Sequence, residues 1–342
     1  MDRNLFSGFI IWTKSAAGIS ILLAIAVAII ASIHSGPYLL VNTIVMGGVL
    51  ALVSTGLTLI LGVLNIAMFA HGEFFMIGSL AAYYVFTPIS EYIATHPGSF
   101  LSSIGPLFAM LAAMVAGAIS GILAEKLVFG PLRKRGTENW VMNTFLLTVG
   151  LGVLLQNSHQ LLFGSDYKGI VRYWEGTPVN IFEAYISRDR VMLIIIATVI
   201  TLLFWLFMSY TRTGRSIRAV SQDITGAEMM GIDIGKIVLL TISLSCALSA
   251  VAGGSLLFMW PSYPSVGLEP LYMAWFVVIL SGLGNILGAV AGAFMVALLK
   301  IITVEYIGSG WDLVIPSALI MLILIFKPSG IFGSSVRSAL DR

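Results

Sequence analysis

The stretch YLLVNTIVMGGVLALVSTGLTLIL, residues 38–61, contains no charged side chain. A helix needs about 20 apolar residues to cross the hydrocarbon core of a bilayer, so this stretch is long enough to span a membrane. The rest of the chain has the same character, because 58% of its 342 residues are hydrophobic and only 10% are charged. A soluble domain carries about 25% charged residues. The composition therefore excludes an ordinary soluble protein.

Apolar stretches of similar kind recur along the whole sequence. We expect membrane segments at residues 16–33, 38–61, 67–86, 104–127, 140–163, 191–210, 237–259, 271–280, 286–304 and 313–326. The first is longer than the core of a typical signal peptide, and we interpret it as a retained membrane helix. The stretch 271–280 is too short to cross as a straight helix. The sequence predicts an all-α polytopic membrane protein with about ten segments, some broken or re-entrant, in a single transmembrane domain over 1–342.

Basic residues indicate the orientation, because lysine and arginine gather in short cytoplasmic loops. Most of the 18 such residues fall on one side of the predicted spans. This set is Arg3, Lys14, Lys126, Arg133, Lys134, Arg135, Arg212, Arg215, Arg218, Lys236, Lys327, Arg337 and Arg342. We therefore expect both termini and the loop 211–235 in the cytoplasm, and the loop 164–190 on the outer, periplasmic side.

Several functions lack the residues that they need. The net charge of +2 is too small to suggest nucleic acid as a partner. A phosphate-binding loop ends in Gly-Lys-Ser/Thr, whereas the Gly235–Lys236 pair is followed by Ile237. Four dispersed histidines give no metal-binding spacing, and we expect no enzyme, no metal and no cofactor. The lone Cys246 is interpreted as a small buried hydrophobe.

One short string resembles an ion-selectivity filter. Residues 148–152 read TVGLG, and potassium channels use backbone carbonyls in a comparable sequence to replace the water around the ion. Here the string lies in the middle of a continuous apolar run without a preceding pore helix and loop. We interpret it as part of a membrane helix.

Polar residues inside apolar segments point to a functional centre, since burying them is costly unless they are paired or line a wet path. NIAMFAHGEFFMIG, residues 65–78, contains Asn65, His71 and Glu73. If the helix starts late, near Ala70, its dipole favours the Glu73 carboxylate. These residues either form part of a transport path or only cap a broken helix.

Two more polar groups are candidates for the same path. Gln156 and Asn157 belong to QNSHQ near the end of the fifth predicted span, where an interfacial helix end is the alternative. Asn285 lies in SGLGNILGAVAG, residues 281–292, directly after the short stretch 271–280. The glycines there predict a helix break, and broken membrane helices commonly line substrate paths.

The cytoplasmic loop 211–235 carries an amphipathic pattern. Ile217, Val220, Ile224 and Ala227 follow one another at spacings of three and four, and Met230 comes next. This spacing predicts a short amphipathic helix. Such a helix either lies on the membrane surface or contacts a partner protein.

Five segments together resemble a known family. FAHGEFFMIGS (69–79), LLQNSHQLLFGSD (154–166), the segment 211–233, LSGLGNILGAVAGA (280–293) and KPSGIFG (327–333) are similar to those of permease subunits of branched-chain amino-acid ABC importers. The resemblance covers the chain from about Tyr38 onward, so the helix 16–33 is additional. It implies a multi-pass protein of the bacterial inner membrane with a second, homologous or identical permease, two cytoplasmic ATPases that bind ATP and Mg²⁺, and an extracytoplasmic solute-binding protein.

The resemblance also implies a role for the loop 211–235. ABC importers dock a loop resembling EAAxxxG into their ATPase, and Thr225, Gly226, Ala227 and Gly231 occupy the matching positions. A threonine replaces the leading glutamate, and the downstream proline is missing. The resemblance makes this loop the ATPase-coupling segment, with Arg215, Arg218 and Glu228 as further contact residues.

The substrate remains open at this point. The family includes importers of branched-chain and other neutral amino acids, urea and short amides. A path with few fixed charges favours a small neutral or zwitterionic solute, with a branched-chain amino acid first. The main rival is an ion-coupled secondary transporter, which should carry ionisable residues deep in several spans. Here only Glu73, Lys300 and Glu305 are candidates, the last two near an outer helix end.

Overall fold

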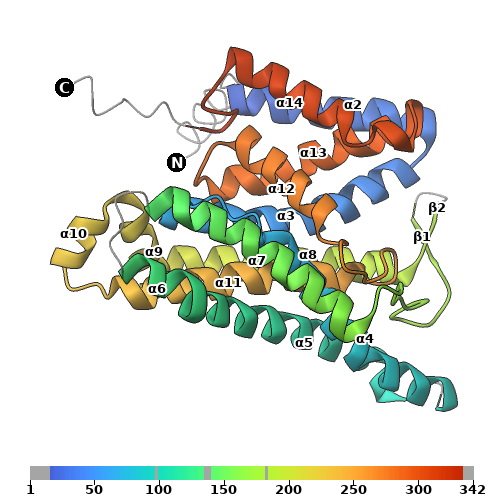
Figure 1. Cartoon of the computed structure of the whole chain (residues 1–342). Coiled ribbons are helices and arrows are strands. Elements are labelled where there is room, and N and C mark those ends of the chain that lie inside the picture. The colour runs from blue at the N-terminus through green and yellow to red at the C-terminus, as the bar shows by residue number, and fades with distance from the viewer. Residues whose placement is uncertain (1–15, 97–98, 135–139, 182–183, 334–342) are drawn as a thin grey trace.

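The computed structural model describes residues 16–96, 99–134, 140–181 and 184–333, and these form a bundle of long helices (Figure 1). The long helices are α2 (Ala16–Ser35), α3 (Tyr38–Leu64), α4 (His71–Thr95), α5 (Phe100–Ala124), α7 (Trp140–Phe163), α8 (Arg188–Tyr210), α11 (Ile234–Leu256) and α13 (Ile286–Tyr306). The shorter elements are the π-helix η1 (Glu125–Phe129), α6 (Gly130–Lys134), α9 (Arg212–Gln222), α10 (Ile224–Met229), α12 (Leu268–Ser281), the 3₁₀ helix η2 (Ser309–Trp311) and α14 (Val314–Phe326). Strands β1 (Val179–Ile181) and β2 (Ala184–Ile186) form an antiparallel hairpin.

Eight helical segments in the described part of the chain are long and apolar enough to cross a membrane. Two further helices complete the set of ten: α4, which is less apolar, and α12, which has only 14 residues. The all-α polytopic fold predicted from the sequence is confirmed. We call the end of the bundle that carries α9 and α10 the α9 end, and the opposite end the hairpin end (Figure 1). Residues 1–15 and 334–342, with Arg3, Lys14, Arg337 and Arg342, and also Arg135, lie outside the described residues, and the predicted orientation stays a prediction.

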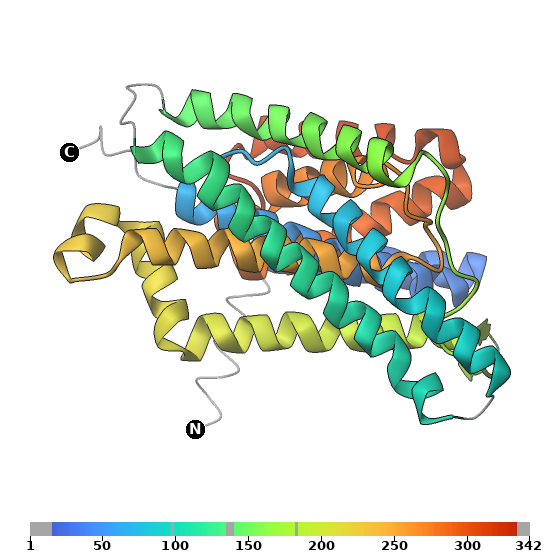
Figure 2. The ribbon, with the colours of Figure 1, turned by 60° about the horizontal axis from the view of Figure 1, so that its bottom comes forward.

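Helices α3 and α11 form the centre of the bundle. Nearly all of their side chains are buried, whereas α2, α7 and α14 expose most of theirs. The two central helices run in opposite directions and contact each other, and small residues allow this approach, since Gly56 lies against the backbone of Ser245. Figure 2 shows α7 and α8 along opposite edges of the bundle. The two central helices are thus surrounded by other helices of the protein, whereas the helices at the edges expose apolar side chains.

Helix α4 begins inside the bundle. After α3 ends at the α9 end, Asn65 takes a left-handed backbone conformation with φ 53°, and residues 66–70 lead back along α3. His71, the first residue of α4, lies beside Val53, so the chain has returned about 16 Å along α3. The third predicted span, 67–86, therefore starts later than expected, at His71, and runs on to Thr95.

Helix α12 also begins inside the bundle, after a non-helical segment that follows α11. The series α3, α4, α5 is thereby repeated by the series α11, α12, α13. In each series a buried central helix is followed by a non-helical segment, then by a helix that starts in the interior, and finally by a helix that returns along the bundle. The two copies run in opposite directions, and α13 packs on α3 as α5 packs on α11. Membrane transporters are often built from such inverted repeats. The repeat brings the starts of α4 and α12 together.

The loop that precedes α8 is folded and anchored. Its Tyr173 is buried and donates a hydrogen bond of 2.6 Å to the Gly254 carbonyl. Asp189 Oδ1 accepts from the backbone N–H groups of Tyr173 and Trp174, at 2.9 and 2.8 Å. Burial and the nearby Asp189 carboxylate raise the pKa of Tyr173 well above its usual range. The sequence prediction of a plain loop over 164–190 missed the hairpin, and α8 starts at Arg188.

Candidate functional site

The starts of α4 and α12 touch through two glycines. Gly72 and Gly267 are so close that a Cβ atom on either would overlap the carbonyl group of the other. The same kind of approach continues along α4, where Gly78 abuts the Ala250 carbonyl of α11. Small residues at membrane helix interfaces let backbones come this close. The contact fixes the position of the polar residues on either side of Gly72.

His71 is fully buried at this junction. Its Nε2 atom lies 3.0 Å from the Val53 carbonyl oxygen of α3, and its own carbonyl accepts from the Ser249 hydroxyl of α11 at 3.1 Å. His71 Nδ1 has no hydrogen-bond partner among the described residues. One ring nitrogen therefore ties α4 to α3, while the other is left without a bond.

Glu73 lies in the first turn of α4 with only 3% of its surface exposed. Its Oε2 atom has no hydrogen-bond partner among the described residues. No side chain caps the N-terminus of α4, so Glu73 faces the positive end of the helix dipole without acting as a cap. A buried acceptor without a bond is costly, and such a group is available to a ligand or a proton.

Two aromatic residues that the sequence analysis missed lie beside this junction. Phe69, in the non-helical segment before α4, stacks on Trp275 of α12 with ring centroids 5.3 Å apart and meets the edge of Phe145 of α7 at the same distance. Phe69 is 37% exposed, and Trp275 Nε1 has no partner in the described structure. The sequence treated both as ordinary apolar span residues. The junction thus carries an aromatic, partly accessible side.

The other predicted path residues lie elsewhere. Asn65 is exposed at the α9 end, where it terminates α3. Gln156 is half-buried, and Asn157 is exposed and donates to the Val153 carbonyl of its own helix at 2.7 Å. The structure therefore does not bring Asn65, Gln156 or Asn157 together with His71 and Glu73.

Asn285 lies at the break between α12 and α13. Its Oδ1 accepts from Gly288 N–H, capping α13, and its Nδ2 donates to the Phe332 carbonyl, each at 2.9 Å. The break that the glycines predicted occupies residues 282–285, and Gly282 has φ 90°. Asn285 also lines a cavity of about 1070 Å³ at the α9 end. The ends of α3, α8 and α12, together with α9 and residues 328–333, surround this cavity.

The loop 211–235 forms two helices where the sequence predicted one. Helix α9 holds Arg215 and Arg218, and α10 holds Thr225, Gly226, Ala227 and Glu228. The chain is extended at Asp223 between them, with φ −155°. Ile217, Val220 and Ala227 are buried, but Ile224 is 45% and Met230 83% exposed, so the predicted apolar stripe is not continuous from α9 into α10. Arg215, Arg218, Thr225, Glu228 and Gly231 are exposed, and Gly226 is half-buried.

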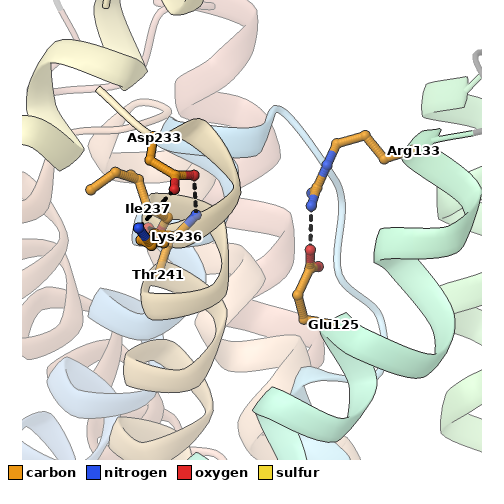
Figure 3. Close-up of polar contacts among 6 residues, drawn as sticks. All are labelled: Glu125, Arg133, Asp233, Lys236, Ile237 and Thr241. Carbon is orange, nitrogen blue, oxygen red and sulfur yellow. Dashed lines mark hydrogen bonds and ion pairs between the residues drawn. The ribbon is translucent and has the colours of Figure 1, made fainter. Parts of the chain in front are cut away.

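Ionic contacts hold the ends of the neighbouring helices (Figure 3). Asp233 caps α11 by accepting from Lys236 N–H at 3.1 Å, and its carboxylate pairs with the Lys236 ammonium at 3.0 Å. This backbone hydrogen bond lowers the pKa of Asp233. Glu125 in the π-helix η1 pairs with Arg133. The first pair lies at the start of α11, directly after α10, and the second belongs to η1, which contacts α11.

A third ionic group lies on the hairpin side of the junction. Lys300 of α13 is buried, pairs with Glu269 in the first turn of α12, and lies 3.3 Å from Asp312. Its ammonium is also 5.3 Å from the centre of the Trp260 ring. The sequence placed Lys300 near a helix end but gave no sign that it is buried and paired. Glu305, named with it, is exposed.

Comparisons with known proteins agree with this architecture. Residues 39–324 match the family model described as branched-chain amino acid transport system / permease component. The chain is 27% identical over 297 residues to the high-affinity branched-chain amino acid transport system permease protein LivH of Escherichia coli K12, covering 85% of this chain and 94% of that protein. It is 27% identical over 299 residues to BraD of Pseudomonas aeruginosa, covering 86% and 94%.

A similar likeness extends to an archaeon. The probable branched-chain amino acid transport permease protein LivH of Methanocaldococcus jannaschii is 27% identical over 311 residues, covering 86% of this chain and 92% of that protein. No solved structure matches the chain. Since the family model covers most of the sequence and the fold is a polytopic helical bundle, the chain is an integral membrane permease that belongs to the branched-chain amino acid transport system permease component family.

Proposed function

We propose that this permease forms one half of the membrane path of an ABC importer in the cytoplasmic membrane and carries a branched-chain or another small neutral amino acid inward. The observation that supports this most is the junction of α4 and α12, where two helices begin inside the bundle beside buried His71 and Glu73. Interior helix starts offer unpaired backbone groups and oriented dipoles to a solute. The relatives named for branched-chain amino acid transport favour that substrate class.

The path runs from the junction toward the cavity at the α9 end. Phe69 and Trp275 supply an apolar aromatic wall for an aliphatic side chain. Glu73 supplies an acceptor for an ammonium group, since its Oε2 has no other partner. Asn285 stands at the rim of the cavity, where the solute leaves. Asn65, Gln156 and Asn157 lie away from the junction. In this proposal they remain candidates only for the outer or inner entrance of the path.

ATP hydrolysis takes place on partner subunits. In this proposal α9 and α10 at the cytoplasmic face transmit it, with exposed Arg215, Arg218, Thr225 and Glu228 available for contact with an ATPase. A second permease, identical or homologous, completes the path. A solute-binding protein docks at the hairpin end. This chain itself needs no cofactor for that task.

Reconstitution tests the proposal. The chain is co-expressed with candidate partners of each kind, namely ATPases, a second permease and a solute-binding protein, then purified by a tag on this chain and placed in liposomes with internal ATP. We expect stoichiometric ATPase recovery and uptake of leucine that needs both ATP and the binding protein. Uptake of urea or a short amide in place of leucine would support the alternative of a urea or short-amide importer. Uptake driven by an ion gradient without ATPases would instead support the secondary-transporter alternative.

A further inference from the structure

Helix α7 touches the rest of the molecule along one narrow stripe. Among its described side chains only Thr144, Thr148, Gly152 and His159 are buried, and these positions recur on one face of the helix. In Figure 2 the helix lies along an edge of the bundle. Thr148 and Gly152 are the ends of the TVGLG string that resembled a channel filter in sequence. In the structure that string is part of the continuous helix α7, so its residues do not form a filter.

Thr148 supplies hydrogen bonds to backbone groups outside its own helix. Its hydroxyl accepts from Phe69 N–H at 3.3 Å and lies 3.2 Å from the Ala67 carbonyl oxygen. The carbonyl of Phe145, in α7 itself, is 2.8 Å away. A threonine hydroxyl has one proton, so it donates to one of these two carbonyls at a time. Residues 66–70 are not helical, and their backbone groups depend on such partners in a membrane interior.

Gly152 lets α7 approach the same segment one turn further along. A Cβ atom there would lie 3.7 Å from Ala70 Cα and 3.8 Å from Glu73 Cγ, which is ordinary contact distance, so a larger side chain would push against both. A Cβ atom on Gly150, two positions earlier, would have no neighbouring atom within 4 Å. The two glycines therefore form a matched pair on opposite faces of one helix.

We propose that Thr148 is a positioning residue, whose hydroxyl holds residues 67–69 against α7 so that the start of α4, with His71 and Glu73, is kept in place and follows the movement of α7. This inference rests on the proposed function, because it assumes that the start of α4 belongs to the path. Thr148 hydrogen-bonds to this segment, and Phe145 and Gly152 of α7 contact it as well. A displacement of α7 therefore reaches the path through this stretch of the helix.

The central variants are Thr148→Val, which keeps the shape and removes the hydroxyl, and Thr148→Ser, which keeps the hydroxyl. Each is measured in the full importer in liposomes for leucine uptake and ATP hydrolysis. We expect Thr148→Val to lower the maximal uptake rate at least tenfold while ATP hydrolysis stays within twofold of the wild type. Thr148→Ser should retain at least half of the wild-type uptake. A purely structural role would lower both activities and the melting temperature together.

Accessibility of the segment gives a second readout that does not need transport. Ala67→Cys in a Cys246→Ser background is labelled with a polar maleimide, and adding Thr148→Val should speed labelling at least fivefold. Adding Thr148→Ser should leave the rate within twofold. Gly152→Leu should act like Thr148→Val in both measurements, whereas Gly150→Leu should act like the wild type.

Three results would overturn the inference: wild-type uptake by Thr148→Val, equal damage by Thr148→Val and Thr148→Ser, or equal labelling in the Gly152→Leu and Gly150→Leu proteins. If Thr148→Val cannot be purified, the glycine pair decides the question. Absence of uptake by the wild-type importer would refute the proposed function alone, because the labelling rates still test whether Thr148 holds residues 67–69.

Discussion

Gly72 and Gly267 meet backbone to backbone at the point where α4 and α12 begin. Because each glycine faces the carbonyl group of the other, even a methyl group must push the two helix starts apart. We expect Gly72→Ala or Gly267→Ala to destabilise the folded permease by about 1–3 kcal/mol, the usual range for overpacking. Thermal unfolding in detergent measures this, with Gly150→Ala as the control. An unchanged melting temperature in both glycine variants would show that the helix starts are not in firm contact.

Glu73 should matter for transport more than for stability. Its only evident structural benefit is the helix dipole, which contributes about 0.3–1 kcal/mol. We therefore expect Glu73→Gln to reach the membrane at normal levels and to lose most uptake in the reconstituted importer. His71→Ala should lose uptake together with some stability, because it also removes the bond to the Val53 carbonyl. Near-normal uptake by both variants would reduce the pair to residues of a broken helix without a role in the path.

Lys300 is shared by Glu269 and Asp312, so its removal leaves two half-buried carboxylates without a cation. Breaking a fully buried ion pair costs about 3–5 kcal/mol, and because water reaches both carboxylates here we expect Lys300→Met to lower the melting temperature by less than that figure implies. The triple variant Lys300→Met, Glu269→Gln, Asp312→Asn should recover much of the loss, because no unpaired charge remains. If the triple variant is as unstable as the single one, packing of the lysine stem explains the effect instead.

The break after α12 should be sensitive to side chains. Gly282 has φ 90° and lies against residues 329 and 333, so Gly282→Leu brings both backbone strain and a clash. Uptake should fall severely, whereas Gly310→Leu, in open space, should behave as the wild type. Labelling of Asn285→Cys, in a Cys246→Ser background, should change when ATP is added to the assembled importer. Strong and equal labelling with and without ATP would mean that this break does not gate the path.

Contact with the ATPase can be separated from folding at α10. Ala227 is 5% exposed, so a bulky residue there should disturb the permease itself. Thr225 and Glu228 are exposed, and Thr225→Trp or Glu228→Arg should weaken ATPase recovery at least fivefold with an unchanged melting temperature. Pull-down and solute-stimulated hydrolysis measure the effect, with Glu228→Gln as the milder control. Full coupling in both variants would exclude α10 as the docking element.

Much of the fold follows from the length of the apolar stretches in the sequence, and the exceptions have physical causes. The late start of α4 was visible in the polar residues His71 and Glu73, and the break before α13 in the glycines around Asn285. The sequence placed Asn157 in the path, but a short polar side chain near a helix end can bond to its own backbone, as Asn157 does with Val153. Spacing alone does not distinguish these outcomes.

Contacts between distant segments were beyond the sequence. Phe69 and Trp275 are separated by 206 residues in the sequence, and the inverted repeat brings their rings together. The pairing of Lys300 with Glu269 depends on the same arrangement. In the loop 211–235, the spacing continued through Ile224, yet the chain breaks at Asp223 and exposes Ile224. Periodicity describes one helix face and carries no information on where the axis changes direction.

The anchored loop before α8 also bears on the proposed docking of a solute-binding protein at the hairpin end. Hydrogen bonds of Tyr173, Trp174 and Asp189 hold the loop against the bundle. The side chains of Tyr167, Val171 and Tyr185 are 73%, 88% and 75% exposed. A surface that is already ordered loses little conformational entropy when a partner binds. If the proposed solute-binding protein docks there, the heat-capacity change of binding should reflect the buried apolar area alone, without a contribution from loop folding.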